Sequence, residues 1–383
     1  MNISIFGSTG SIGRNTLDVV RRLPGRFRII SLSANSNTDI LLRQIREFHP
    51  RYVCVKDSES AVKLSKAVSG KTKILTGEDG LLCLAEEKKT QKIMLAISGS
   101  DALMPLIKAI ESGKQIALAN KEALVIAGPI IMKMLKNSNA SIIPVDSEQS
   151  AIWQCLEGRD RYKLNKIYLT ASGGPLLRTK KNELRNISIG RVLNHPRWIM
   201  GKKISVDSAT LMNKGLEFLE AMFLFNIPAQ KVKILIHPEA IIHSMVEFND
   251  GIIIAQLSIA DMRIPIQYAL TYPERMPKKI GSVDFFRLKS LNFEKPDTSR
   301  FPCLELAYQA ARKLGTYPCV LNAANEVSVE SFLDKRINFV SIPKIIEKVL
   351  GRHHNIVKPD LCAIQGAQAW AKEEARRLIN RLN

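Results

Sequence analysis

The sequence predicts an α/β protein that begins with a doubly wound parallel sheet and continues into a central α+β domain and a C-terminal helical bundle. Short apolar runs alternate with helix-length amphipathic segments from residue 1 to about residue 145, as is typical of parallel βαβ units. This alternation ends after residue 150, and helical spacing dominates from residue 303 onward. The 383 residues, 45% of them hydrophobic, are enough for two or three domains with cores of their own.

The individual elements follow from the same patterns. Strands of the first domain are expected at residues 3–6, 28–32, 52–55, 92–97, 115–118 and 141–145. The central domain is expected to contain strands at 166–170, 232–236 and 251–258, one long helix at 209–225, and an apolar turn at 236–245 with two structural histidines, His237 and His243. A connection at 272–302 precedes helices at 303–314, 323–333, 342–350 and 363–382.

The charge of the chain is strongly positive. Fifty-six Lys and Arg residues face 36 Asp and Glu residues, a formal net charge of +20, and residues 159–203 alone hold twelve basic and two acidic residues. Such an excess attracts phosphorylated or polyanionic partners. A nucleic-acid-binding module is one alternative, but aromatic residues are only 6% and no basic run is interleaved with stacking side chains. Small phosphorylated metabolites are therefore the expected partners, with no nucleic acid.

The cysteines and the apolar runs indicate a compartment. Six scattered cysteines fit neither a disulfide framework nor a zinc site, so they are expected to be thiols in a reducing environment. The first strand begins at residue 3, which leaves no room for a targeting segment. No apolar run reaches the roughly 18 residues that span a bilayer. We therefore expect a cytoplasmic protein without a membrane partner.

A glycine-rich loop follows the first strand. Residues 7–13 read GSTGSIG, and an amphipathic helix with Leu17 and Val20 on its inner side comes next. Strand, glycine loop and helix in this order form the pyrophosphate site of a Rossmann-like domain, although a purely structural glycine turn gives the same pattern. The second strand ends in Ala34-Asn35-Ser36-Asn37 without the carboxylate that an NAD site places there. This favours NADPH, unless the segment is a polar turn with no ligand role.

Two carboxylates lie at the end of the last strand of the first domain. Asp146 and Glu148 are two residues apart, at the sheet edge where ligands of open α/β sheets bind. Carboxylate oxygens are the ligands of hard divalent cations. The alternative is a helix N-cap formed by Asp146 or Ser147. A metal site needs a third oxygen donor.

The long central helix offers that third donor. Asn213, Lys214 and Glu217 are spaced three and four apart, so they share one side of the helix. The alternative is an ordinary surface Lys–Glu pair. The preceding residues 205–210 are dense in hydroxyl groups, and hydroxyls with one amide and one lysine suit a phosphate monoester.

Three further segments complete the candidate site. Lys121 follows the fifth strand, at the same sheet edge as Asp146, and could equally be a helix-start lysine. The run 170–175, TASGGP, has the hydroxyls and glycines of an anion loop, although a plain turn is the commoner meaning. Residues 195–201, HPRWIMG, place Trp198 in a polar stretch, which predicts a flap over 194–203 that closes on a ligand and excludes water.

These motifs together closely resemble the 1-deoxy-D-xylulose 5-phosphate reductoisomerase family. The matching segments are GSTGSIG at 7–13, ALANKEALV at 117–125, PVDSEQSAI at 144–152, TASGGP at 170–175, HPRWIMGKKISVDSATLMNKGLEFLEA at 195–221 and IHPEAIIHSMVE at 236–247. The resemblance implies a homodimeric enzyme of the non-mevalonate isoprenoid pathway. It would convert 1-deoxy-D-xylulose 5-phosphate into 2-C-methyl-D-erythritol 4-phosphate with NADPH and Mg²⁺, Mn²⁺ or Co²⁺. The alternative is a related oxidoreductase acting on another phosphorylated substrate.

The resemblance also implies roles for individual residues. The metal ligands would be Asp146, Glu148 and Glu217, and the catalytic residues Lys121, Glu148 and His195. The substrate would be bound by Lys121, Ser147, Glu148, Ser172, His195, Trp198, Ser208, Asn213, Lys214 and Glu217. The cofactor would touch Thr9, Gly10, Ser11, Ile12, Asn37, Asn120, Glu122 and Gly201, with Met200 and Met262 beside the nicotinamide or substrate.

The same resemblance implies the domain organisation and exposes one departure. Residues 1–146 would bind NADPH, 147–275 would carry catalysis, metal and dimerisation, 276–302 would be a linker and 303–383 a helical domain. The family usually has a basic residue within the segment 34–37, which is absent here. We therefore expect a reduced preference for NADPH, partly restored by Arg43 or Lys56.

Overall fold

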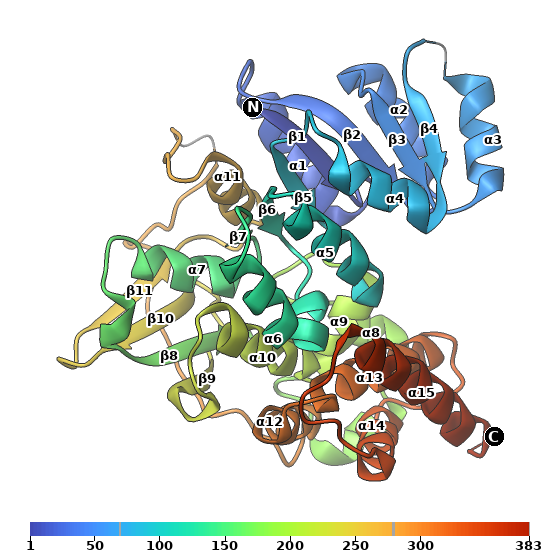
Figure 1. The fold of residues 1–383 in the computed structure, drawn as a ribbon. Helices are drawn as coiled ribbons and strands as arrows, with labels where there is room; N and C mark the ends of the chain where they lie inside the picture. The colour runs from blue at the N-terminus through green and yellow to red at the C-terminus, as the bar shows by residue number, and fades with distance from the viewer. Residues whose placement is uncertain (69, 278–279, 383) are drawn as a thin grey trace. The chain divides into compact units, whose positions relative to one another are not determined.

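The computed structural model describes residues 1–68, 70–277 and 280–382 (Figure 1). Contacts divide the chain into two compact units. Unit 1 comprises Met1–Ala123, Ile131–Ser150 and Asp261–Gly281, and unit 2 comprises Leu124–Ile130, Ala151–Ala260 and Ser282–Asn383. Among the described residues, no helix is both long enough and apolar enough to cross a membrane.

Unit 1 is built on a parallel sheet of seven strands in the order β4-β3-β2-β1-β5-β6-β7. The strands are β1 Asn2–Phe6, β2 Arg28–Ala34, β3 Tyr52–Val55, β4 Lys73–Thr76, β5 Lys92–Leu95, β6 Gln115–Leu118 and β7 Ser141–Pro144. The doubly wound sheet and its six predicted strands are confirmed. The edge strand β4 was not predicted, because its four residues lack a buried apolar run.

Helices follow the strands in alternation. They are α1 Ser11–Arg22, α2 Thr38–Phe48, α3 Ser58–Ala67, α4 Gly77–Glu86, α5 Leu103–Glu111, α6 Glu122–Lys136, α7 Ser147–Leu156 and, much later in the chain, α11 Arg263–Thr271. A 3₁₀ turn, Gly99–Ala102, precedes α5. Helices α6 and α7 contribute residues to both units.

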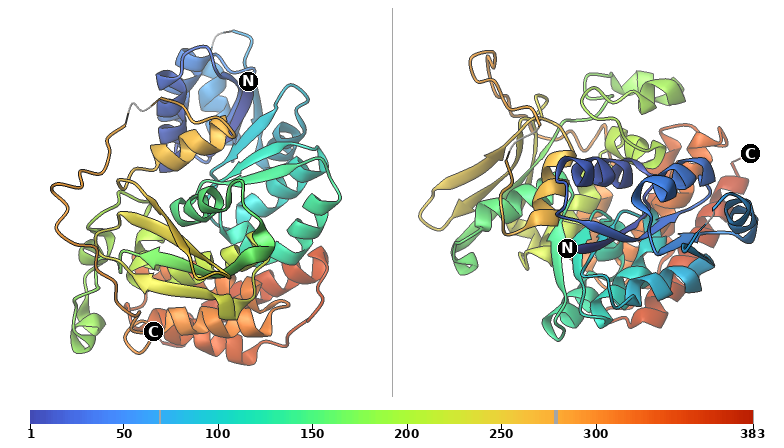
Figure 2. Two further views of the ribbon diagram at one scale, coloured as in Figure 1. Left: turned by 90° about the vertical axis from the view of Figure 1, so that its left-hand side faces the viewer. Right: turned by 90° about the horizontal axis from the view of Figure 1, so that it is seen from above.

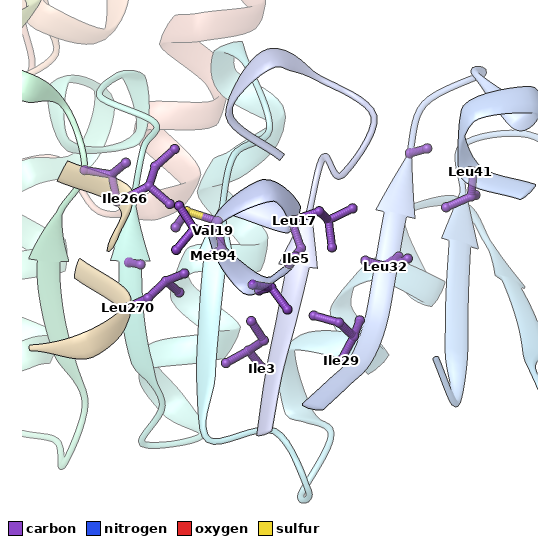
Figure 3. Close-up of a cluster of buried hydrophobic side chains, with 14 of the residues drawn as sticks. Ile3, Ile5, Leu17, Val19, Ile29, Leu32, Leu41, Met94, Ile266 and Leu270 are labelled. Atoms are coloured by element: carbon purple, nitrogen blue, oxygen red, sulfur yellow. The ribbon is translucent and has the colours of Figure 1, made fainter. Parts of the chain in front are cut away.

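A layer of apolar side chains joins α1 and α11 to the sheet (Figure 3). Its members include Ile3 and Ile5 from β1, Leu17 and Val19 from α1, and Ile266 and Leu270 from α11. Full burial of such a side chain stabilises the fold by about 1.5–3 kcal/mol. The helix that follows the glycine loop is therefore fixed on the sheet by its own inner face.

Unit 2 contains a four-stranded mixed sheet and a helical bundle. The sheet has the order β11-β10-β8-β9, with β8 Leu164–Ala171, β9 Val232–Ile236, β10 Ile242–Phe248 and β11 Ile253–Leu257. The helices are α8 Ile189–Leu193, α9 Lys202–Ala209, α10 Met212–Leu224, α12 Cys303–Lys313, α13 Tyr317–Leu333, α14 Ser341–Arg352 and α15 Leu361–Asn380, with 3₁₀ turns at Arg161–Lys163, Lys181–Asn186 and Ala229–Lys231. Helix α13 packs against both α14 and α15, which confirms the C-terminal bundle (Figure 2, orange to red).

Two details of unit 2 differ from the sequence prediction. The segment expected to be an apolar turn over 236–245 is a turn only at 237–241, and residues 242–245 begin strand β10, which lies between β8 and β11. The helix expected at 209–225 is present as α10 but begins only at Met212, because Leu211, whose φ is 60°, separates it from the unpredicted helix α9. A leucine in the left-handed region is held there by its surroundings, and local sequence gives no sign of it.

Lys92 shows how α11 is tied to the sheet. Its side chain is fully buried, and Nζ donates to the carbonyl oxygens of Ala269 at 2.8 Å and Leu270 at 2.9 Å. These carbonyls lie in the last turn of α11, where cations are stabilising. Burial nevertheless lowers the pKa of Lys92 to about 8.

This lowered pKa predicts a pH dependence of stability. Above pH 8 the folded protein loses a proton that the unfolded chain keeps until about pH 10.5. The contribution of Lys92 to the free energy of unfolding should therefore rise across this range, on the order of 3 kcal/mol. Urea denaturation at pH 7 to 10.5 should show this rise in the wild type and lose it in Lys92→Met. Lys66→Met, which removes an exposed lysine, is the control; equal pH curves for wild type and Lys92→Met would contradict the prediction.

Candidate active site

The glycine loop of unit 1 has a shape that only glycine permits. Gly7 has a φ of +85°, and a Cβ there would lie 2.5 Å from the carbonyl oxygen of Ala96. A Cβ on Gly13 would lie 2.3 Å from the carbonyl oxygen of Gly7. The helix behind the loop, α1, starts at Gly10 without a side-chain cap. Its first amide groups are thus available to an anion, as a pyrophosphate site requires.

The segment that follows β2, where a dinucleotide ribose would bind, carries no charged side chain at residues 34–37. Asn37 caps α2 by accepting from the amide of Ile40 at 3.1 Å, so its side chain already has a structural partner. The amide of Lys56 donates to the carbonyl oxygen of Asn35 at 3.1 Å, which places Lys56 directly beside this segment. Arg43 instead donates to the carbonyl oxygen of Asp39 at 3.4 Å. Of the two candidate cations, Lys56 is the one fixed to the strand end.

Lys121 and Asp146 meet at the carboxyl edge of the sheet. They follow β6 and β7, two adjacent strands, and their side chains form an ion pair with side-chain exposures of 9% and 14%. Ser147 Oγ donates to Glu148 Oε2 at 2.6 Å. The sequence prediction that Lys121 and Asp146 share one sheet edge is therefore confirmed. A lysine that merely starts a helix would be expected at the surface. The buried pairing of Lys121 with Asp146 therefore disfavours that alternative.

Asn120 is occupied by contacts within unit 1. Its Nδ2 donates to the carbonyl oxygens of Ile97 and Gly99, both at 2.9 Å, and to Glu122 Oε2 at 3.0 Å. Its Oδ1 accepts from the amide of Ala123 at 2.8 Å, at the start of α6. The side chain thus fixes the loop that carries Lys121. Contact of Asn120 and Glu122 with a cofactor stays a prediction.

The anion loop of unit 2 packs directly on Ser208. Gly173 and Gly174 have φ values of +82° and +69°, and a Cβ on Gly174 would lie 2.7 Å from the carbonyl oxygen of Ser208. The amide of Gly174 donates to Ser172 Oγ at 3.3 Å. The loop after β8 is therefore bent so that the turn carrying Ser172 packs against Ser208.

His195 organises the flap. Its Nδ1 accepts from the amides of Arg197 at 3.1 Å and Trp198 at 2.9 Å, and its Nε2 lies 3.1 Å from Ser172 Oγ. Since Nδ1 accepts two hydrogen bonds, the proton of the neutral ring is on Nε2, which donates to Ser172. Burial lowers the pKa of His195 to about 4. The imidazole therefore stays neutral at physiological pH.

The rest of the flap is held on strand β10 and its neighbouring turn. Arg197 Nε donates to the carbonyl oxygen of Pro238 at 3.0 Å, and the ring centroid of Trp198 lies 6.1 Å from that of His243. Ile199 is 98% exposed, an unusual position for an isoleucine. An exposed apolar side chain in this segment is compatible with the predicted flap, which stays a prediction.

Helix α10 presents the predicted trio on one side. Asn213 Nδ2 donates to Glu217 Oε1 at 2.5 Å, and Lys214 pairs with Glu217 Oε2. The side chains of Lys214 and Glu217 are only 4% and 1% exposed, which excludes the surface-pair alternative. A buried pair of this kind is costly to desolvate, so its retention calls for a functional explanation.

Asp207 was overlooked by the sequence reasoning. It is 1% exposed; its Oδ1 accepts from Asn325 at 2.8 Å, and its Oδ2 pairs with Lys203 at 2.8 Å. The carboxylate thereby ties α9 to α13 next to Ser208. The only sign of Asp207 in the sequence was its place in a hydroxyl-rich segment. Its hydrogen-bond partner Asn325 lies more than a hundred residues away in the chain.

The predicted site residues fall into both units. Thr9, Gly10, Ser11, Ile12, Asn37, Asn120, Lys121, Glu122, Asp146, Ser147, Glu148 and Met262 belong to unit 1. Ser172, His195, Trp198, Met200, Gly201, Ser208, Asn213, Lys214 and Glu217 belong to unit 2. The polar cluster of unit 1 comprises the Lys121–Asp146 pair and the Ser147–Glu148 hydrogen bond, and that of unit 2 comprises the Ser172–His195 hydrogen bond and the contacts of Glu217 with Asn213 and Lys214.

Comparison with known families matches nearly the whole chain. Residues 3–128 match 1-deoxy-D-xylulose 5-phosphate reductoisomerase, residues 142–225 the C-terminal domain of the same family, and residues 257–374 the DXP reductoisomerase C-terminal domain. The 1-deoxy-D-xylulose 5-phosphate reductoisomerases of Caldanaerobacter subterraneus and Chlorobaculum tepidum are 49% and 48% identical, over 97% and 99% of this chain and 98% and 99% of theirs.

Solved structures show the same similarity. A DOX-P reductoisomerase in complex with NADPH, fosmidomycin and magnesium has a TM-score of 0.94 and 38% identity, covering 100% of this chain and 99% of that one. The enzyme from Zymomonas mobilis in complex with NADPH has a TM-score of 0.91 and 39% identity, covering 99% of this chain and 98% of the other.

Proposed function

The chain belongs to the 1-deoxy-D-xylulose 5-phosphate reductoisomerase family, and we propose that the two polar clusters described above are the parts of its active site. The protein is an NADPH-dependent oxidoreductase that converts 1-deoxy-D-xylulose 5-phosphate into 2-C-methyl-D-erythritol 4-phosphate in the isoprenoid pathway. It uses NADPH and a divalent cation such as magnesium. The assignment of roles to residues rests chiefly on the buried Lys214–Glu217 pair.

The phosphate of the substrate would be held by Ser172, Ser208, Asn213 and Lys214. A solved relative contains fosmidomycin, an analogue of the phosphorylated substrate. In this chain the glycine turn at Gly174 brings the loop of Ser172 against Ser208, and Lys214 supplies a buried positive charge. Hydroxyl donors around one ammonium group recognise a single phosphate by the directions of their hydrogen bonds as well as by charge.

The divalent cation would be held by Asp146, Glu148 and Glu217. Carboxylate oxygens are the donors that Mg²⁺, Mn²⁺ and Co²⁺ accept in such sites. When bound, the cation supplies charge stabilisation for substrate oxygens during the rearrangement. Without it, Lys121 neutralises Asp146, and Lys214 neutralises Glu217.

Lys121, Ser147 and Glu148 would act on the reacting carbons. The Lys121 ammonium group can donate to a substrate oxygen as negative charge develops on it. The hydrogen bond from Ser147 keeps one Glu148 oxygen oriented, so that the carboxylate can accept a proton from a substrate hydroxyl. The substrate oxygens would thus be placed between a donor and an acceptor that the sheet edge holds in position.

The cofactor would bind along the carboxyl edge of the parallel sheet. The uncapped start of α1 and the loop residues Thr9, Gly10, Ser11 and Ile12 suit its pyrophosphate. Asn37, Asn120, Glu122 and Gly201 would contact the rest of the molecule, with Met200 and Met262 near the nicotinamide. When bound, NADPH supplies the hydride that reduces the rearranged aldehyde.

His195 and Trp198 would close the site. The neutral imidazole donates to Ser172 while its Nδ1 holds the backbone of the flap, so one ring couples the flap to the phosphate loop. A closed flap would exclude water from the reactive intermediate. We would therefore assign His195 to substrate binding and flap closure.

The absent cation near the ribose gives a prediction on cofactor choice. The ratio of kcat/KM for NADPH over NADH should be lower than in a relative that carries a basic residue at this position. Lys56→Gln should lower the ratio further, by up to about 5-fold, since an exposed charge pair is worth about 1 kcal/mol or less. Arg43→Gln is the matched control and should change it less. A wild-type ratio as large as that of the relative would show that the missing cation is irrelevant.

A homodimer, a cytoplasmic location and the predicted domain roles also belong to this proposal. Strand β11 is the free edge of the second sheet, with an exposed apolar side chain on Ile253 and a half-buried one on Ile254. Such an edge can pair with a second copy of the chain.

The described cysteines are free thiols, as a reducing compartment allows. Residues 1–146 would form the cofactor domain, 147–275 the catalytic and dimerisation domain, 276–302 the linker and 303–383 the helical domain.

The direct test is oxidation of NADPH that depends on 1-deoxy-D-xylulose 5-phosphate, followed by the loss of NADPH absorbance with and without a divalent metal. We expect turnover only when the substrate, NADPH and the metal are all present. Turnover on another phosphorylated sugar, with none on 1-deoxy-D-xylulose 5-phosphate, would refute the assignment.

A further inference from the structure

A second concave site lies in unit 1, at the sheet edge opposite the glycine loop. It is a cavity of about 750 Å³ at the edge where β1, β2, β3 and β4 begin. The glycine loop follows the end of β1, so the two sites are separated by the length of the strands. None of the proposed active-site residues lines this cavity.

The walls of the cavity are positively charged. Six basic side chains line it, all of them exposed: Arg28, Arg46, Arg51, Lys71, Lys73 and Lys89. Within the described part of the chain, no aspartate or glutamate lines the cavity, and none of the six forms an ion pair within 4.0 Å. By contrast, Lys63 nearby on α3 is paired with Asp39 at 2.9 Å. The six charges thus line one concavity, and among the described residues none of them has a carboxylate within ion-pairing distance.

The strand register forces some of these charges together. The amide of Lys73 donates to the carbonyl oxygen of Arg51 at 2.9 Å, and the amide of Arg51 donates to Ile30 at 2.9 Å. Adjacent strands are about 4.8 Å apart, so cations on β2, β3 and β4 span roughly 10 Å. Like charges on neighbouring strands repel and destabilise the sheet. A bound anion would remove this repulsion.

Helix termini do not explain the cluster. A cation in the last turn of a helix is stabilised by the carbonyl groups there. Of the six, only Arg46 occupies such a position, in the last turn of α2. Arg28 and Lys73 are the first residues of β2 and β4, and Arg51 directly precedes β3. Strands have no comparable dipole, so a helix dipole does not account for the cations at these positions.

The cavity also has an apolar floor. Ile29, Ile45 and Pro50 are buried beneath the cations, and Leu42 and Val68 line the side. Its volume lies in the range of small-molecule sites, about 300–1,000 Å³. Six cations around one concavity can neutralise the charge of two linked phosphoryl groups, which is greater than the charge of one, and the apolar floor suits a small organic body attached to them. We propose that this cavity binds a small organic diphosphate.

Calorimetric titration of the full-length enzyme saturated with NADPH tests the proposal. The probes are hexyl diphosphate and inorganic pyrophosphate at constant ionic strength. We expect saturable binding of hexyl diphosphate, and weaker binding of pyrophosphate because it cannot use the apolar floor. Arg51→Gln/Lys73→Gln should weaken hexyl diphosphate binding at least about 10-fold, as loss of charge-assisted hydrogen bonds does. The KM values for substrate and NADPH should be unchanged.

Two control variants locate the binding. Lys133→Gln/Lys136→Gln removes the same charge from α6, elsewhere in unit 1, and should leave binding intact. Lys214→Gln changes the proposed phosphate site of the substrate and should also leave it intact. The proposal is overturned if Lys214→Gln abolishes binding while Arg51→Gln/Lys73→Gln does not, if both double variants weaken it equally, or if pyrophosphate binds as tightly as hexyl diphosphate. These outcomes do not depend on the roles proposed for the active site.

Discussion

Glu217→Gln is expected to reduce kcat/KM by at least about 1,000-fold at saturating Mg²⁺, since a metal-centred charge contribution of several kcal/mol would be lost. The substitution keeps the volume of the side chain and its place beside Asn213 and Lys214, but it removes the negative charge. Asp146→Asn is expected to have an effect of the same size. Steady-state NADPH oxidation over a range of Mg²⁺ and Mn²⁺ concentrations measures it.

The affinity of the two variants for NADPH distinguishes loss of the metal site from a general disruption of the structure. Fluorescence titration should give a Kd for NADPH within about twofold of wild type in both variants, because neither carboxylate is proposed to contact the cofactor. Glu330→Gln, the same chemical change on the exposed side of α13, should leave activity unchanged. Appreciable residual turnover of Glu217→Gln at saturating metal would contradict the metal assignment.

Lys214→Gln is expected to lower kcat/KM for 1-deoxy-D-xylulose 5-phosphate by about 100-fold or more. A buried, hydrogen-bonded charge contact is worth about 2–5 kcal/mol when one partner is removed. The substitution also leaves the buried Glu217 carboxylate without its cation, so the melting temperature must be measured in parallel.

The unphosphorylated sugar 1-deoxy-D-xylulose distinguishes phosphate recognition from structural damage. The wild type should prefer the phosphorylated substrate strongly, and Lys214→Gln should lose most of that preference, with little change in its low rate on the unphosphorylated sugar. Lys348→Gln, which changes an exposed lysine on α14, is the matched control. If Lys214→Gln slows both substrates equally, the side chain acts on structure or on the metal and does not read the phosphate.

The distribution of charge is clearer in the structure than in the sequence. Residues 159–203 hold half of the net positive charge, which the sequence assigned to steering of phosphorylated ligands. Several of these cations are ion-paired, including Lys166 with Glu247 at 2.8 Å and Lys203 with Asp207 at 2.8 Å. Paired cations contribute little to a long-range field. The unpaired cations at the start of β2, β3 and β4 lie outside that segment.

The sequence by itself determined the fold class, the parallel sheet and the residue types of the site. Buried strands such as β5 and β6 consist mostly of consecutive apolar residues, and the helix after the glycine loop has a regular inner face, so the local pattern reports their burial. The trio on α10 could be predicted for the same reason, because a spacing of three and four residues places side chains on one side of a helix.

Only the tertiary structure decided features that depend on distant contacts. Strand β4 has few apolar residues and pairs through its backbone with β3 at the sheet edge, so its composition did not mark it. The attachment of α11 through Lys92 and the contact of Asp207 with Asn325 both rest on partners far away in the chain. Periodicity records which side of an element is buried. Periodicity does not identify the residues that pack against the buried side, and at Lys92 and Asp207 those residues determine the local structure.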